Sequence, residues 1–154
     1  VTDIDTEKVK RVVQATDAEA VAADRIYDVP ADIYSPNALG ATVNDDTLKR
    51  LKVEVIAGGA NNQLAEERHG DECERRGLLY APDYVINGGG VINVYGELMG
   101  WDHDRAKRKA AQIYDTLLSI YATAQAEKIP TYRAADHVAE ARIRAVGTLA
   151  GIRV

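Results

Sequence analysis

The chain has 154 residues, of which 46% are hydrophobic, and its net charge is −5. This length and hydrophobic content are enough for one domain with a substantial core. Its acidic balance, with a pI near 5.2, argues against a nucleic-acid partner or an anionic membrane surface. The sequence shows no long apolar run and no signal peptide, and its single cysteine, Cys73, cannot form an internal disulfide. We therefore expect a cytoplasmic protein.

The N-terminal region predicts a strand end followed by a helix. Val1–Asp3 reads as the last part of a strand and no Met precedes it, so we expect a fragment that begins inside a fold. Asp5 is a suitable N-cap for a helix over 6–16. A short strand is predicted at 19–22, and a loop at 26–30 because Pro30 disfavours helical geometry in the residue before it.

Short strands alternate with helices in the middle of the chain. Strands are predicted at 31–34, 53–57, 78–80 and 84–86, and helices at 44–51 and 63–76, with Gly77 ending the second helix. This alternation indicates the α/β class with a mostly parallel sheet.

The C-terminal third predicts helices. Gly88, Gly89 and Gly90 form the sharpest break, after which helical spacing resumes over 91–99. Long amphipathic patterns then predict helices over 104–128 and 134–146, separated by Pro130.

Three stretches carry candidate chemistry. Asp3 ends a predicted strand before a helix. In a dinucleotide-binding fold, an acid at that place contacts ribose hydroxyls and disfavours a 2′-phosphate, although the position taken alone fits a solvated strand-end residue better. Asn61 lies in a Gly-Gly-Ala-Asn-Asn-Gln turn, which suits either a ligand or a helix N-cap. Asn87 and the glycines after it predict close backbone approach to a ring or a substrate.

The remaining histidines and the cysteine do not form a recognisable catalytic or metal-binding pattern. His69, within a charged segment, fits a surface or capping role better than catalysis, and the three histidines do not have metal-ligand spacing with Cys73. The glutamates on both sides of Cys73 would raise its pKa.

Four strings together resemble the glutamate/leucine/phenylalanine/valine dehydrogenase family. They are Asp32–Gly40, Gly59–Leu64, Tyr80–Asn87 with its glycines, and Ile129–Asp136, the last resembling the leucine-specific branch. The resemblance covers essentially the whole chain. It implies a Rossmann-like doubly wound fold, with a core over about 1–100 and C-terminal helices over 101–154, which lacks the first strand, its glycine-rich turn and the N-terminal substrate domain.

The resemblance also implies a cofactor, a reaction and residue roles. NAD would contact Asp3, Ala38, Leu39, Asn61 and Asn87, whereas Val91 and Val94 would line an apolar pocket for L-leucine or a related branched-chain amino acid. The reaction would be oxidative deamination to a 2-oxo acid and ammonia. No catalytic residue is expected in this chain, because the family's lysines and aspartate lie in the absent domain.

Two hypotheses of different class follow. The chain is one half of an NAD-dependent amino-acid dehydrogenase, active with its N-terminal half and assembled as a homo-oligomer, or it is a non-catalytic nucleotide-binding or folding fragment. A different Rossmann oxidoreductase or a methyltransferase is a distant third. Without the first strand, two apolar sheet edges would be unpaired, so we expect the chain alone to fold poorly.

Overall fold

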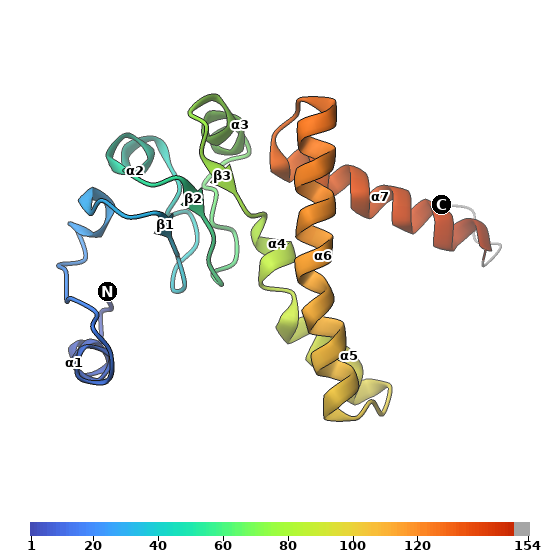
Figure 1. Ribbon diagram of the computed structural model, residues 1–154, viewed down its shortest axis with the longest axis horizontal. Coiled ribbons are helices and arrows are strands. Elements are labelled where there is room, and N and C mark those ends of the chain that lie inside the picture. The colour runs from blue at the N-terminus through green and yellow to red at the C-terminus, as the bar shows by residue number, and fades with distance from the viewer. Residues whose placement is uncertain (150–154) are drawn as a thin grey trace.

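The computed structural model describes residues 1–149 and shows an α/β fold (Figure 1). Its sheet has three parallel strands in the order β1-β2-β3: β1 (Ile33–Tyr34), β2 (Val55–Ile56) and β3 (Leu79–Tyr80). The register pairs Ile33 with Val55 and Val55 with Leu79. The parallel α/β prediction is thus confirmed, with each strand shorter than its predicted range.

Two short helices follow β1 and β2. α2 (Asp45–Arg50) begins at a capping box in which Asn44 and Thr47 bond to each other's backbone. α3 (Arg68–Arg75) starts later than predicted, because residues 63–65 instead pair with Val43: Gln63 O accepts from Val43 N at 2.9 Å, and Ala65 N donates to Val43 O at 3.0 Å. Gly77 ends this region with φ +70°, as predicted.

The main core lies between the strands and these helices. Ile56 and Tyr80 are almost completely buried, and Tyr132 joins the same cluster from the C-terminal part of the chain. Thr131 reinforces this connection by donating from its hydroxyl to Tyr80 O at 2.6 Å. The carboxyl end of β3 is therefore anchored to the C-terminal helices.

Residues 84–86 do not form a strand. They belong to α4 (Asp83–Ile86), a single helical turn in which Asn87 N donates to Asp83 O at 3.0 Å. Pro82 and Asp83 are favourable residues for a helix start, whereas a three-residue apolar run has no readable period. The strand prediction was wrong because it rested on the apolar run alone.

The three glycines do not break the chain in the predicted way. Gly88 is the N-cap of α5 (Gly89–Leu98), and Ile92 N donates to Gly88 O at 3.0 Å. Two of the glycines therefore lie inside a helix, and the expectation of bare backbone after a strand is corrected. Packing against neighbouring helices outweighs the low intrinsic helix propensity of glycine here.

The two long C-terminal helices are confirmed. α6 (His103–Glu127) ends at Lys128, whose φ is +56°. α7 (Thr131–Leu149) begins three residues before the predicted range, directly after Pro130. Ile120, Ala124, Ala134 and Ala135 form a second buried cluster between the two helices. Within residues 1–149, no helix is long and apolar enough to span a membrane.

The N-terminal segment lies apart from the sheet in Figure 1. The predicted helix is confirmed as α1 (Thr6–Ala15), capped by Asp5, but none of its residues is buried. The strands predicted at 1–3 and 19–22 are wrong: these segments exchange only two bonds, Val1 N to Glu19 O and Val21 N to Val1 O, without a neighbouring strand. The loop predicted at 26–30 contains η1 (Ile26–Asp28), a 3₁₀ turn.

Candidate functional site

The turns after β1 and β2 lie against each other at the carboxyl edge of the sheet. A side-chain carbon added to Gly58 would lie 2.1 Å from Pro36 O, so only glycine fits this contact. Asn37 bridges the same turns, because its Oδ1 accepts from Gly59 N at 2.8 Å. The two turns form one surface, at the edge where open α/β sheets bind ligands.

Asn61 and Asn87 meet at this edge. Asn87 Nδ2 donates to Asn61 Oδ1 at 2.6 Å, although the two residues come from different turns. Asn61 is exposed and Asn87 is half-buried. The bond leaves the Asn61 amide nitrogen as a donor and the Asn87 amide oxygen as an acceptor, and together these two groups complement the edge of a carboxamide.

Ala38 and Leu39 lie in the turn after β1, next to this pair. Both are exposed, and Leu39 is 74% exposed despite its apolar side chain. The adjacent Gly40 lies close to the Asn61 carbonyl, since an added carbon would be 2.7 Å from Asn61 O. An exposed leucine beside glycines gives a flat apolar surface for a ring.

Val91 and Val94 lie on the exposed side of α5. Their exposed fractions are 75% and 58%, and Leu98 continues the same face with 80%. Residues three and four apart share one helix face, so these side chains form an open apolar strip. α5 follows Asn87 through Gly88, which connects this strip to the carboxyl edge.

Asp3 is not brought to the other predicted residues by any contact. It is exposed, and its Oδ1 accepts from Asp5 N at 2.8 Å. The segment around Asp3 is not a strand, so the structure of residues 1–149 does not place Asp3 at a strand tip. Its role in ribose binding stays a prediction.

Asp83 and Tyr80 were missed by the sequence analysis. The Asp83 carboxylate accepts from Tyr80 Oη at 2.9 Å and from Asn62 N at 2.5 Å. Burial, followed by the nearby Asp83 charge, raises the pKa of Tyr80, so the phenol stays protonated and donates. The signal in the sequence that could have identified Asp83 is an acidic residue at a helix start, four residues before Asn87.

His69 and Cys73 are both buried. His69 is only 2% exposed, so a surface role is wrong. Its Nδ1 accepts from Glu66 N at 3.0 Å, just before the N-cap Glu67 of α3, and α3 itself has no side-chain cap bond, so the capping role is not confirmed. Burial raises the pKa of the Cys73 thiol to about 12, a larger cause than the charge of Glu72. Among residues 1–149, no group of three His, Cys, Asp or Glu side chains could hold a metal ion.

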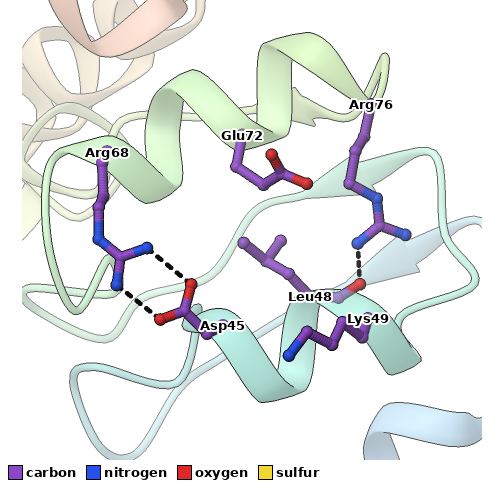
Figure 2. Close-up of a pocket in the computed structure, with 6 residues that line it drawn as sticks. All are labelled: Asp45, Leu48, Lys49, Arg68, Glu72 and Arg76. Carbon is purple, nitrogen blue, oxygen red and sulfur yellow. Dashed lines mark hydrogen bonds and ion pairs between the residues drawn. The ribbon is translucent and has the colours of Figure 1, made fainter.

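A cavity of about 260 Å³ lies between α2 and α3 (Figure 2), and neither Asn61 nor Asn87 is among its lining residues. Its charged groups are paired: Arg68 makes two bonds to Asp45, at 2.7 and 2.5 Å, and Arg76 bonds to Leu48 O. Figure 1 shows α2 and α3 at one end of the strands and the turns after β1 and β2 at the other. We therefore place the candidate site at the amide pair.

Residues 2–151 match the family model described as Glutamate/Leucine/Phenylalanine/Valine dehydrogenase. The chain belongs to this family. Leucine dehydrogenase from Thermoactinomyces intermedius is 55% identical over 143 residues, which cover 93% of this chain and 39% of that protein. Phenylalanine dehydrogenase from Caldalkalibacillus thermarum is 41% identical and covers 94% of this chain and 40% of that protein. The chain thus spans about two fifths of the relatives' length.

Solved structures of the family share the fold. L-tryptophan dehydrogenase from Nostoc punctiforme matches with a TM-score of 0.85 and 43% identity, over 94% of this chain and 43% of that one. A hetero-hexameric glutamate dehydrogenase from Thermus thermophilus matches with a TM-score of 0.69 and 18% identity, over 98% of this chain and 38% of that one. The second match supports the family fold alone.

Proposed function

We propose that this chain is the NAD-binding side, and part of the substrate pocket, of a dehydrogenase that oxidatively deaminates branched-chain L-amino acids of the leucine type. The observation that carries the proposal is the Asn61–Asn87 amide pair, which lies at the sheet's carboxyl edge and is followed by the apolar strip of α5. Similarity to leucine dehydrogenase supports the substrate class.

The residues at this edge fit NAD. The amide pair has one donor and one acceptor left for a carboxamide, and exposed Leu39 offers a surface for a ring. Asp3 would accept from ribose hydroxyls and repel a 2′-phosphate, which favours NAD over NADP. When bound, NAD supplies the acceptor for the hydride that leaves the amino acid α-carbon.

The chain's own residues would orient the reactants. Asn61 and Asn87 would bind polar groups through their amides, while the exposed Val91 and Val94 would contact the aliphatic side chain of the substrate. A side-chain carboxylate of an acidic amino acid, placed against these valines, would be desolvated without a partner, so acidic amino acids are disfavoured as substrates. Loss of the hydride from the α-carbon and of a proton from the amino group to the general base would leave an imino acid, which water hydrolyses to the 2-oxo acid and ammonia.

The general base and the cation for the substrate carboxylate are proposed to lie in an N-terminal portion of the enzyme. The relatives are longer than this chain, which leaves room for such a portion. We also propose that the enzyme is cytoplasmic and assembles as a homo-oligomer. The rival proposal is a fragment that binds the nucleotide or nothing and has no turnover in any context.

Joining residues 1–154 to the N-terminal part of the Thermoactinomyces intermedius enzyme tests the proposal. We expect NADH formation that requires L-leucine and NAD, measured by absorbance. The matched control is the relative's own enzyme, and residues 1–154 alone should give none. An inactive joined protein that folds and binds NAD would favour the fragment hypothesis.

Pocket specificity is tested by Val94→Asp in the joined enzyme. A buried carboxylate facing an aliphatic substrate should lower kcat/KM for L-leucine by roughly 100-fold. Val146→Asp is the matched control, because Val146 is a helix valine of similar exposure, 56% against 58%. Equal effects of the two substitutions would remove Val94 from the pocket.

A further inference from the structure

Asn62 connects the three turns at the carboxyl edge through its backbone. Its carbonyl accepts from Ala41 N at 2.7 Å, in the turn after β1. Its N–H donates to Asp83 Oδ2 at 2.5 Å, in the turn after β3. Its φ is +51°, a left-handed conformation that side chains disfavour and that persists only where neighbouring contacts hold it.

Asp83 supports both members of the amide pair. Its side chain holds the N–H of Asn62, the residue next to Asn61. Its carbonyl accepts from Asn87 N at 3.0 Å and so fixes the end of α4. One residue therefore links the backbones that carry the two amides.

The Asp83 carboxylate is itself held in place. Tyr80, only 2% exposed, donates to its other oxygen at 2.9 Å. Because both oxygens are used, the side chain has one favourable orientation, and the charge-assisted bond to Asn62 is stronger than a bond to a neutral acceptor.

We propose that Asp83 is a positioning residue of the dehydrogenase: it sets the placement of Asn61 relative to Asn87 and thereby aligns the reactants for hydride transfer. The inference rests on the proposed function. Asp83 acts through the Asn62 backbone and α4 rather than by contact with a reactant. Tyr80 completes the arrangement by orienting the carboxylate.

Asp83→Asn in the joined enzyme tests the proposal. The amide keeps the shape but loses the charge. Its oxygen can still accept from Asn62 N, but the bond is no longer charge-assisted, so the turn is held less firmly. We expect kcat with L-leucine to fall at least about tenfold, because small misalignments slow transfer strongly. The isotope effect with α-deuterated leucine should rise as hydride transfer becomes rate-limiting. Asp46→Asn, an exposed carboxylate on α2, is the control.

A rescue variant separates positioning from general stability. Glycine adopts a left-handed φ without steric cost, so Asp83→Asn combined with Asn62→Gly should recover several-fold of the lost kcat. Recovery supports the proposal. A fall in kcat that Asn62→Gly does not relieve, with an unchanged isotope effect and a lowered melting temperature, would show a structural role and overturn it.

Amide exchange gives a readout independent of activity. In the joined protein, the Asn62 N–H should exchange at least about tenfold faster after Asp83→Asn, and unchanged exchange overturns the proposal. Absence of turnover in the unsubstituted joined protein would count against the proposed function, while the exchange result still decides whether Asp83 holds the turn.

Discussion

At the residue scale, glycines with similar sequence neighbours have opposite surroundings. Gly58 lies against the backbone of Pro36, whereas Gly90, inside α5, has open space where a side chain would start. Both lie in glycine-rich strings, so the sequence alone does not distinguish a required glycine from a replaceable one. The difference comes from a turn 22 positions away that packs on one of them.

Gly58→Ala should destabilise the protein, because its new carbon would overlap Pro36 O and N, and backbone atoms cannot move aside freely. We expect a loss of about 3 kcal/mol in the free energy of unfolding, measured by urea denaturation. Gly90→Ala is the control and should add roughly 0.5–1 kcal/mol, since alanine favours the helix. Equal effects would contradict the close contact of the two turns.

Cys73 should be chemically inert while the protein is folded. Burial raises its pKa to about 12, so at about pH 8 the thiolate fraction is roughly a thousandfold below that of a free cysteine. Iodoacetamide should therefore label the unfolded protein quickly and the folded protein very slowly, as followed by mass spectrometry. Rapid labelling under native conditions would show that this part of the core opens.

At the element scale, α2 and α3 are held together across the cavity of Figure 2 by Asp45 and Arg68. The Arg68 guanidinium lowers the pKa of Asp45 to about 2, with a smaller effect from His69. Both side chains are more than half exposed, at 53% and 57%, so solvent and salt screen the pair. The pair orients the helices more than it stabilises them.

The Asp45 pair should make stability depend on acid pH. Because the folded pKa lies below the unfolded one, the contribution is present above about pH 4 and is lost as the pH falls to about 2. Asp45→Asn should flatten the decline of the urea midpoint across this window. Asp46→Asn, 92% exposed, should keep the original slope. High salt should reduce the difference between the two variants.

At the scale of the whole molecule, α1 and the outer edge of β1 have few packing contacts with the rest of residues 1–149. α1 buries no residue, and Ile33 on the edge strand β1 is 55% exposed. Figure 1 shows α1 separated from the sheet. An isolated helix of this length is marginally stable in water, so its order depends on packing that residues 1–149 do not supply.

α1 should exchange its amides much faster than α6 in residues 1–154 alone. Joining the N-terminal part of the relative should raise protection in α1 by at least about tenfold, because packing then supplements its own bonds. Exchange followed by mass spectrometry measures this. Unchanged protection would mean that α1 does not pack on the N-terminal portion.

The α/β class, the parallel strands and the long helices could all be predicted from the amino-acid sequence. These depend on local signals, such as the Asn44 cap, Gly77 at the end of α3 and the extended apolar stripe of α6. Helical periodicity over many residues is read reliably because each turn repeats the same information. Asn61 and Asn87 were also chosen from the sequence as neighbours of a ligand, and the structure places them in contact.

The contacts between the turns, and the bonds that hold them, could be seen only in the folded chain. The helical turn at 84–86 begins at Asp83, whose carboxylate accepts from Asn62 N, 21 positions earlier in the chain, and no local pattern contains this contact. His69 is buried for a similar reason, since it lies on α3 with its Nε2 3.4 Å from Asp45 at the start of α2. Local sequence sets the period of an element, but the burial and the partners of a polar group depend on segments distant in the chain.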